Sequence, residues 1–415
     1  MPDFAPVLDQ FALLERGVVD FHVRAELELR LEESRRSGRP LRVKAGFDPT
    51  RSDLHLGHAV VLQKMRQFQD LGHTAIFLIG DVTARVGDPT GQNESRPRLT
   101  REDVEAAAET YLAQAFKVLD PRGIELRRNS EWLDRLSLGE TVELMAKVTV
   151  SRMLERKDFR QRFQEERPIH QHEFLYPLLQ GYDSVALGCD VELGGTDQLF
   201  NLLMGRDLMA KYGKRPQIVM TTPILEGTDA RIENGEVVGR KMSKSADNFI
   251  GLKEPPAIMY RKAMQIDDAV VFRFFKLLSQ RGTAEVDALE QDKENGRNPL
   301  EIKSIFAREI VERFHGTEDA QRAAAEFDRV YAGNALPEEV PVVEITSGGL
   351  VELAWAIKQA GLAVTTSEAH RLVLQGGVEV DGKRATSPKM RLDAGHDYLV
   401  RVGSKNRRFA RIRVA

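Results

Sequence analysis

The segment from residue 41 to residue 81 constrains the fold most strongly. Residues 41–47 (LRVKAGF) alternate apolar with other residues, DPTRSD supplies a turn, and apolar residues at helical spacing follow as far as Leu71. The next run, TAIFLIGD (74–81), is short and continuously apolar, as expected for a strand covered on both faces. Strand, helix and strand in this order predict a parallel sheet.

The rest of the chain extends this pattern and then departs from it. Further strands are expected at 184–195 and 217–225, with a helical stretch from about 197 to 212 between them. Residues 1–240 therefore predict a Rossmann-like, doubly wound parallel-sheet domain with a helical insertion at about 100–180. Helical patterns near 257–264, 268–279, 299–314 and 317–332 predict a separate α-helical domain within 241–335. Two prolines and three acidic residues favour an extended linker at 336–347.

Charge is distributed unevenly along the 415 residues. Residues 348–415 hold 12 Lys and Arg against 6 Asp and Glu, while the whole chain has a net charge of −3. A basic C-terminal module on an acidic body fits contact with a polyanion, although a solvated basic surface is the equal alternative. No signal peptide or membrane span is expected, which points to the cytoplasm. The single cysteine, Cys189, excludes an intramolecular disulfide and is interpreted as structural.

His55-Leu56-Gly57-His58 lies where the loop after the first strand becomes a helix. Backbone N–H groups and the helix dipole favour phosphate at that place, and Gly57 lets a base or ribose approach the backbone. His55 and His58 can donate hydrogen bonds to phosphoryl oxygens. Metal binding is the rival use of two histidines, and H-x-x-H alone is equally compatible with an ordinary surface or core pair.

Lys241-Met242-Ser243-Lys244-Ser245 follows a glycine on a polar loop. Such a loop carries two ammonium groups and two hydroxyls and can close over a triphosphate. Nucleotidyl transfer depends on positioning and charge neutralisation, so lysines that arrive with the transition state suit it. A solvated run of charges is the alternative.

HLGH and KMSKS, in this order and on a Rossmann-like domain, resemble the two signatures of class I aminoacyl-tRNA synthetases. The segments AGFDPTRSDLHLGH, IGDVTARVGDPTG, YPLLQGYDS and ELGGTDQLFNLLMGR resemble bacterial tyrosyl-tRNA synthetases, and with the C-terminal module the resemblance covers nearly the whole chain. It implies a tyrosine–tRNA ligase, which forms tyrosyl adenylate and pyrophosphate from L-tyrosine and ATP. The tyrosyl group then passes to the 3′ end of tRNA(Tyr).

Tyr176, Gln180 and Asp183 recur at spacings of four and three, which predicts that they share one helix face. The resemblance implies that Tyr176 and Gln180, with Asp88, hold the α-ammonium of tyrosine and that Asp183 accepts its phenol hydroxyl. Gln198 would hold the carboxylate region. A site that hydrogen-bonds a substrate hydroxyl rejects the analogue without it, so no editing domain is required.

The same resemblance assigns the ATP site to the FDPT and GGTD turns and the two signature motifs. The residues are Asp48, Thr50, His55, Gly57, His58, Gly195, Asp197, Lys241, Met242, Ser243, Lys244 and Ser245. Of these, His55, His58, Lys241 and Lys244 would stabilise the pentacoordinate phosphate and the departing pyrophosphate. Mg²⁺ is expected to arrive with ATP, and neither a prosthetic group nor a protein metal site is expected. The turn residues are open to a second interpretation as local caps.

Two positions depart from the pattern of the relatives. Lys44 stands where many of them have a tyrosine that touches the substrate hydroxyl, and Gln92 replaces a lysine of a phosphate-side loop. A lysine buried without a partner is costly, so Lys44 is expected to pair with a carboxylate or to point outward. Arg96 is expected to supply the charge that Gln92 lacks.

The basic module at 348–415 predicts two short helices followed by a strand and a turn, and it resembles the S4-type RNA-binding domain. Six basic residues are expected to contact tRNA phosphates: Arg371, Lys383, Arg384, Lys389, Arg407 and Arg408. Docking onto a protein is the weaker alternative.

The resemblance implies a homodimer, with the insertion at about 120–165 supplying the dimer interface. The predicted partners are therefore ATP, L-tyrosine, tRNA(Tyr) and a second copy of the chain, with no membrane. A tryptophanyl-tRNA synthetase is an alternative that Asp183 and the S4-like module disfavour. A non-catalytic RNA-binding regulator is another, which the intact motifs and the tyrosine pocket disfavour.

Overall fold

The computed structural model describes residues 4–49, 53–89, 99–332, 336, 340–346, 350–403 and 407–415. The chain divides into two compact units. The first contains Met1–Pro255 and Lys262–Phe314, and the second contains Pro256–Arg261 and His315–Ala415. The domain boundary predicted at residue 240 therefore lies inside the first unit, which joins the sheet to most of the helical region that follows it.

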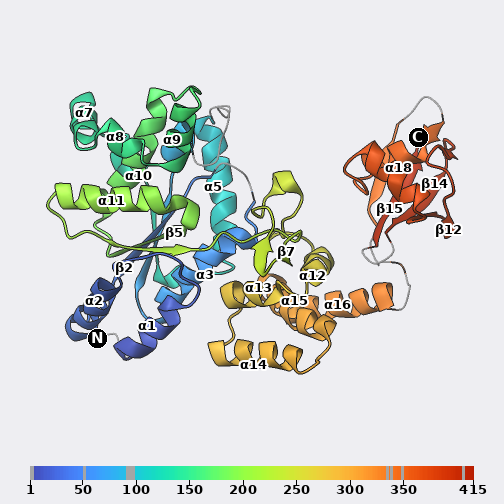
Figure 1. The fold of residues 1–415 in the computed structure, drawn as a ribbon, viewed down its shortest axis with the longest axis horizontal. Helices are drawn as coiled ribbons and strands as arrows, with labels where there is room; N and C mark the ends of the chain where they lie inside the picture. The colour runs from blue at the N-terminus through green and yellow to red at the C-terminus, as the bar shows by residue number, and fades with distance from the viewer. Residues whose placement is uncertain are drawn as a thin grey trace. The chain divides into compact units, whose positions relative to one another are not determined.

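A six-stranded sheet forms the centre of the first unit (Figure 1), in the order β1-β6-β5-β2-β3-β4. Its strands are β1 (Phe21–His22), β2 (Arg42–Phe47), β3 (Thr74–Ile79), β4 (Ile124–Arg128), β5 (Val191–Gly195) and β6 (Ile218–Thr222). All are parallel except β1, which pairs antiparallel with β6 at one edge. The chain leaves β2 toward β3 and β4 on one side and later fills β5 and β6 on the other. Ligands bind at such a switch point, outside the carboxyl ends of the strands.

Two strand predictions need correction. Residues 184–187 belong to helix α10 (Gln171–Leu187), which ends where Gly188 adopts φ 58°, so only Val191–Gly195 of the segment 184–195 is a strand. Glycine is favoured at that position because it has no Cβ to oppose a left-handed backbone. Strand β4 lies inside the predicted helical insertion, where its sequence IELRR lacks a continuous apolar run because it is a half-exposed edge strand.

Helices cover the sheet and build the insertion. Those before the insertion are α1 (Val7–Glu15), α2 (Arg24–Ser37), α3 (Leu56–Asp70) and α4 (Thr83–Val86). The insertion contains α5 (Arg101–Ala115), α6 (Ser130–Leu133), α7 (Leu138–Ala146), α8 (Val150–Met153), α9 (Lys157–Gln164) and α10, with a short 3-10 turn, η1 (Pro121–Gly123). A shared apolar core holds Leu144, Phe159 and Leu178 against Leu208 of α11 (Leu199–Lys211). Tyr176, Gln180 and Asp183 lie on α10, as the predicted helix requires.

The region after the sheet begins with a hairpin and continues as helices. Strands β7 (Arg231–Glu233) and β8 (Glu236–Val238) pair just before the KMSKS loop, which contains the 3-10 turn η3 (Lys244–Ala246). The helices are α12 (Pro256–Gln265), α13 (Val271–Leu278), α14 (Thr283–Glu294) and α15 (Pro299–His315). Three of these correspond to predicted helical patterns. Helix α14 was not predicted, because Val286 is its one buried hydrophobic residue and its apolar periodicity is weak.

The second unit contains α16 (Thr317–Phe327), the π-helical turn η4 (Asp328–Ala332) and a small α+β module. Its helices are α17 (Leu353–Gln359) and α18 (Thr366–Leu374), and β10 (Val351–Glu352) pairs with β13 (Arg391–Leu392). Its main sheet has the order β12-β11-β14-β15-β9, with β9 (Val342–Ile345), β11 (Val378–Val380), β12 (Lys383–Arg384), β14 (Asp397–Val402) and β15 (Arg408–Val414). The predicted two helices, strand and turn are confirmed.

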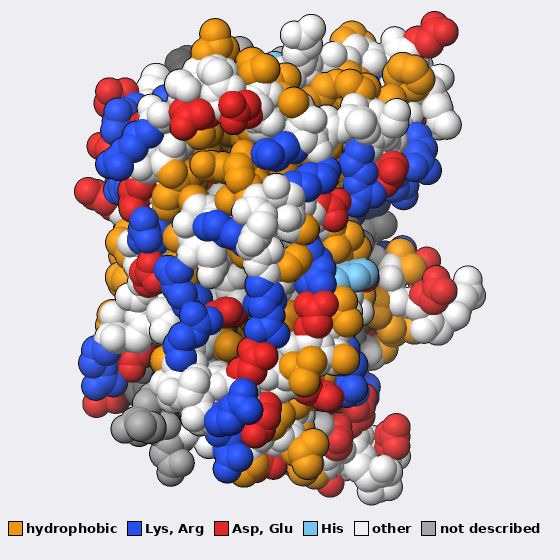
Figure 2. Space-filling model, turned by 90° about the vertical axis from the view of Figure 1, so that its left-hand side faces the viewer, with side chains coloured by type: hydrophobic (Ala, Val, Ile, Leu, Met, Phe, Trp, Pro, Cys, Tyr) orange, Lys and Arg blue, Asp and Glu red, His pale blue; other side chains and the backbone are white. Residues whose placement is uncertain are grey.

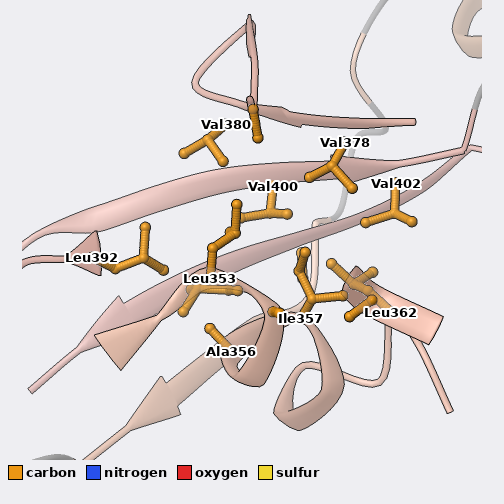
Figure 3. Close-up of a cluster of buried hydrophobic side chains, with 14 of the residues drawn as sticks. Leu353, Ala356, Ile357, Leu362, Val378, Val380, Leu392, Val400 and Val402 are labelled. Atoms are coloured by element: carbon orange, nitrogen blue, oxygen red, sulfur yellow. The ribbon is translucent and has the colours of Figure 1, made fainter. Parts of the chain in front are cut away.

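A closed apolar core holds this module together (Figure 3). Leu353 and Ile357 of α17 point toward Val378, Val400 and Val402 of the sheet. The linker prediction is wrong at Val342–Ile345, because this segment pairs in parallel with β15 and buries Ile345 in the core. Four residues directly after a proline gave too short a strand pattern to identify. No helix in the described part of the chain is long and apolar enough to cross a membrane.

Candidate active site

A cavity of about 1390 Å³ opens at the carboxyl ends of β2, β3 and β5 in the first unit. Nine of the residues predicted for the tyrosine and ATP sites line it: Asp48, His58, Asp88, Tyr176, Gln180, Asp183, Asp197, Gln198 and Lys241. We call the region around Asp183, Tyr176 and Lys44 the buried end, because these three side chains are almost fully enclosed. The region around Asp197 and Lys241 is called the loop end.

Asp183 lies on α10 and its carboxylate is held from one side by two donors. Trp132 Nε1 donates to Oδ1 at 2.8 Å, and Asn129 Nδ2 donates to Oδ2 at 3.3 Å. Burial raises the pKa of Asp183 to about 7, although the charge on Lys44 and the two donors oppose that shift. Neither Trp132 nor Asn129 was predicted, because the sequence segment that carries them has no motif to mark it.

Asp48 joins the FDPT turn to the tyrosine pocket. The Tyr176 hydroxyl donates to its Oδ2 and the Thr83 hydroxyl to its Oδ1, both at 2.7 Å. Burial raises the pKa of Asp48 to about 7, against the effect of these two hydrogen bonds. Gly80 makes room for the arrangement, since a Cβ there would lie 2.0 Å from Asp48 Oδ1. Tyr176 is therefore joined to Asp48 by a direct hydrogen bond.

Asp88 and Gln198 meet at another wall of the cavity. Gln198 Nε2 donates to Asp88 Oδ2 at 2.8 Å, and Asn201 Nδ2 donates to Gln198 Oε1 at 2.9 Å. The largely buried guanidinium of Arg156 donates to Asp88 Oδ1 at 3.1 Å and to Asn201 Oδ1 at 3.2 Å. Arg156 was not predicted. The four side chains form a network that presents amide and carboxylate groups to the cavity.

Lys44 pairs with a carboxylate, as predicted, and the partner is Glu192 on β5. Nζ of Lys44 lies 2.8 Å from Glu192 Oε1. Burial opposes the charge on Lys44, but the attraction of Glu192 and of Asp183 outweighs it, so the pKa of Lys44 is raised.

Gln180 on α10 lines the cavity, and its buried Oε1 has no hydrogen-bond partner among the described residues. That oxygen is available to a ligand.

The HLGH motif caps the N-terminus of α3. Gly57 N donates to His55 Nδ1, and His55 N donates to His58 Nδ1, each at 3.2 Å. Burial and the nearby Lys241 lower the pKa of His58 to about 4, so its ring is neutral at pH 7. Because Nδ1 accepts a hydrogen bond, the proton of the neutral ring sits on Nε2. His58 is thus a neutral hydrogen-bond donor at the cavity wall.

The KMSKS loop is tied to the rest of the first unit through ion pairs and a buried asparagine. Lys241 Nζ lies 2.7 Å from Asp197 Oδ2, and Lys244 pairs with Asp53. Asn248 Oδ1 accepts from Ser243 N at 2.9 Å. Met242 is buried, whereas the Lys241 side chain is 60% exposed. The two lysines are therefore held by contacts that solvent and ligands can replace.

The two signature motifs are neighbours although about 185 residues separate them in the sequence. His55 forms an isolated antiparallel bridge with Gly251, and Leu56 N donates to Ile250 O at 2.9 Å. Seven other residues predicted for the ATP site do not line the cavity that the described residues form. They are His55, Gly57, Gly195, Met242, Ser243, Lys244 and Ser245. Thr50, Gln92 and Arg96 lie outside the described residues. In the described part of the chain, no group of three or more His, Cys, Asp or Glu is arranged to hold a metal ion.

The six basic residues predicted to contact RNA differ in how much they are exposed. Arg371 on α18, Lys383 and Arg384 on β12, and Lys389 in the turn that follows are exposed. Arg407 and Arg408 are half-buried, with Arg407 donating to the Val330 carbonyl at 3.0 Å and Arg408 lying 4.0 Å from Glu368. The first four residues are therefore the accessible part of the predicted RNA-contact set.

Two protein families match this chain. The family described as "tRNA synthetases class I (W and Y)" matches residues 36–332, and the S4 domain matches residues 356–397. A tyrosine–tRNA ligase from Geobacter sulfurreducens is 48% identical over 411 residues, covering 99% of this chain and 100% of the relative. One from Bordetella pertussis is 49% identical over 404 residues, covering 97% and 96%.

Solved structures support the same fold. The C-terminally truncated mitochondrial tyrosyl-tRNA synthetase of Aspergillus nidulans matches with a TM-score of 0.65 at 23% identity, over 78% of this chain and 94% of that structure. The Archaeoglobus fulgidus tyrosyl-tRNA synthetase, solved in complex with L-tyrosine, gives a TM-score of 0.60 at 22% identity, over 77% and 100%. With both signature motifs beside one cavity and an S4 domain at the C-terminal end, the chain belongs to the tyrosine–tRNA ligases of the class I aminoacyl-tRNA synthetases.

Proposed function

We propose that the cavity binds the side chain of L-tyrosine at its buried end and ATP at its loop end. The observation that carries this assignment is Asp183, whose two oxygens already accept hydrogen bonds from Trp132 and Asn129. Asp183 lines the cavity, and its remaining lone pairs suit a hydroxyl donor. A phenol fills that role and a phenyl ring does not, so the site favours tyrosine over phenylalanine.

The amino acid backbone of the substrate would lie toward Tyr176, Gln180, Asp88 and Gln198. The unpartnered Oε1 of Gln180 and the carboxylate of Asp88 are acceptors for an α-ammonium group. Gln198 would orient the substrate carboxylate, with Arg156 holding Asp88 in place. These contacts leave the carboxylate free to attack a phosphate.

In the first step the tyrosine carboxylate attacks the α-phosphorus of ATP, and the bond to the pyrophosphate oxygen breaks. The carboxylate is already ionised, so the step needs no general base. His58 would donate from Nε2 to a phosphoryl oxygen, and His55 would act beside it at the N-terminus of α3. Lys241 and Lys244 would exchange Asp197 and Asp53 for the phosphates as negative charge develops. Mg²⁺ bound to ATP would supply neutralisation of the phosphate charge.

The turns around ATP would supply the remaining contacts. Asp48 and Thr50 in the FDPT turn, and Gly195 and Asp197 after β5, would contact the phosphates and the ribose. Gly57 would let the nucleotide approach α3. Met242, Ser243 and Ser245 would shape the loop that closes over it.

In the second step a ribose hydroxyl at the 3′ end of tRNA(Tyr) takes the tyrosyl group from the adenylate. The S4 module would bind the tRNA through its exposed basic residues, with Arg407 and Arg408 in supporting positions. Deleting residues 340–415 should leave tyrosine-dependent pyrophosphate exchange intact and weaken aminoacylation by about 10²-fold at moderate salt. Loss of both activities would mean that the module supports the catalytic fold instead.

The insertion would form a homodimer interface, and the reaction would take place in the cytoplasm. Helix α7 leaves Leu138, Val142 and Met145 exposed, with 82% of Leu138 accessible, and Val150 of α8 and Phe163 of α9 are exposed as well. Figure 2, which looks onto the side of the molecule that carries α7 and α11, shows hydrophobic side chains gathered among charged ones. Light scattering should report a dimer, and Leu138→Glu with Val142→Glu should shift it to a monomer. A monomeric wild-type protein would refute the interface.

The test of the whole assignment is ATP–pyrophosphate exchange with tyrosine, phenylalanine and tryptophan in turn. Exchange with tyrosine alone, reduced in Asp183→Ala and Lys244→Ala, is the expected result. Exchange with tryptophan would move the assignment to the sister enzyme of the same family. Silence with all three would favour an RNA-binding protein without catalysis.

A further inference from the structure

A buried ion pair lies behind Asp183, and the proposed mechanism does not use it. The side chains of Lys44 and Glu192 are each 1% exposed, and Lys44 lines the cavity. Burying two charges is costly even when they pair, and apolar residues of similar volume often replace such pairs without loss of stability. Stability alone therefore gives no reason for a lysine at this position.

The ammonium group of Lys44 is fixed by the groups around it. Its three donors are met by Glu192 Oε1 at 2.8 Å, Ser184 Oγ at 2.8 Å and the Gln180 carbonyl at 3.5 Å. Glu192 Oε2 in turn accepts from Ser184 at 2.7 Å and from Gln217 at 2.6 Å. The lysine thus ties β2 and β5 to the helix that carries Asp183, and it has no donor left for a substrate.

Several charged or titratable groups act on Asp183 from different elements. Lys44 faces it from β2 and Glu192 from β5, while the neutral donors Trp132 and Asn129 hold its oxygens. Cys189 also interacts with Lys44, and burial raises its pKa to about 12, so this thiol stays uncharged. Lys44 is the cation of this group, and its attraction for Asp183 exceeds the repulsion from Glu192.

We propose that Lys44 is a positioning residue for substrate selection, whose fixed ammonium favours the ionised form of Asp183, a carboxylate that can only accept hydrogen bonds. This inference rests on the proposed role of Asp183. An ionised carboxylate left facing a phenyl ring loses a hydrogen bond that the phenol supplies, whereas a protonated carboxyl bears no charge and discriminates less. The lysine therefore sets selectivity through the aspartate, without touching the substrate.

The experiment measures kcat/KM in pyrophosphate exchange for tyrosine and phenylalanine from pH 5.5 to 8.5. The ratio of the two cancels the titration of ATP. In Lys44→Met the ratio at pH 7.5 should fall by about threefold, because the midpoint of its pH dependence moves up by about one unit from near 7. The double variant Lys44→Met/Glu192→Gln leaves no unpaired buried charge, and its midpoint should move in the same direction by less. It keeps the test valid if the single variant fails to fold.

Lys64→Met is the matched control. Lys64 is also buried, but its ammonium donates to the backbone carbonyls of Leu14 and Arg16. Its substitution should leave the ratio and its pH profile unchanged. An unchanged ratio in folded Lys44 variants, or an equal change in Lys64→Met, would overturn the inference. Asp183→Asn separates failure of the proposed function from failure of this inference. If Asp183→Asn leaves the tyrosine-to-phenylalanine ratio unchanged, the proposed function fails. If Asp183→Asn abolishes the ratio while the Lys44 variants leave it unchanged, the inference alone fails.

Discussion

At the buried end of the cavity, Asp183 and Asp48 each accept hydrogen bonds from two side chains, whereas at the loop end Lys241 and Lys244 pair with Asp197 and Asp53 on more exposed surfaces. The first arrangement is rigid, because buried polar groups cannot give up a partner cheaply. The second is exchangeable, because exposed ion pairs contribute little free energy and compete with solvent and ligands. The comparison indicates that one end selects a substrate by fixed geometry and the other responds to charge during the reaction.

The largest effect should come from removing the acceptor at the buried end. Asp183→Ala removes the acceptor of Trp132 Nε1, one of the two acceptors of Asn129 Nδ2 and the acceptor for the phenol. We expect kcat/KM for tyrosine to fall by about 10³-fold, as for loss of one partner in a buried charged hydrogen bond. Phenylalanine should be affected far less, which pyrophosphate exchange with both amino acids measures. Equal losses for both substrates would contradict a role in selection.

Removing a charge at the loop end should act on the rate instead. Lys244→Ala should lower kcat by about 10²-fold with little change in KM for tyrosine, because the ammonium is needed as charge develops on the phosphates. Its thermal stability should stay near wild type, since the lost ion pair is partly exposed. Lys253→Ala, another exposed lysine close in sequence, is the control and should retain full activity. A change confined to KM for tyrosine would mean that Lys244 acts on tyrosine binding at the buried end and not on the reaction at the loop end.

The pH dependence of the free energy of unfolding should reveal the ionisable group Asp48 that is enclosed at the buried end. The pKa of Asp48 is about 7 when folded, against 3.8 as its ordinary value. The folded protein therefore binds the proton more tightly, so the contribution of Asp48 to stability is present at low pH and is lost as pH rises from about 4 to 7. Relative to Asp48→Asn, wild type should lose ~2 to 3 kcal/mol between pH 5 and pH 8. Thermal unfolding of both proteins at the two pH values measures this, and a constant difference would contradict the burial of an ionisable group there.

The smallest effect, and the most specific to the loop end, concerns Asp53. If Lys244 must leave Asp53 to reach ATP, Asp53→Asn should lower KM for ATP by about twofold to fivefold, the size of an exposed ion pair. The effect should shrink in high salt, where the pair is already screened. Asp70→Asn breaks an exposed pair with Arg66 on α3 and serves as the control. A higher KM for ATP in Asp53→Asn would mean that Asp53 supports the nucleotide site directly.

Local patterns were sufficient for most of the architecture. The strands at 42–47, 74–79 and 218–222, the helix carrying Tyr176 and Asp183, and the two helices of the C-terminal module follow from periodicity and turn residues. The errors have physical reasons. Strand β4 lies at an exposed edge and carries charged residues, and β9 is too short to show alternation, so both gain their strand structure from a neighbouring strand.

The candidate site likewise contains some features that the sequence predicts and others that it does not. The sequence by itself determined the motifs HLGH and KMSKS, the polar face of α10 and the presence of a basic C-terminal module, because each depends on residues close together in the chain. Only the tertiary structure decided that Trp132 and Asn129 hold Asp183, that Arg156 holds Asp88, and that Glu192 is the partner of Lys44. These contacts join residues 51 to 148 positions apart, and their geometry arises from the packing of helices onto the sheet, which no local pattern encodes.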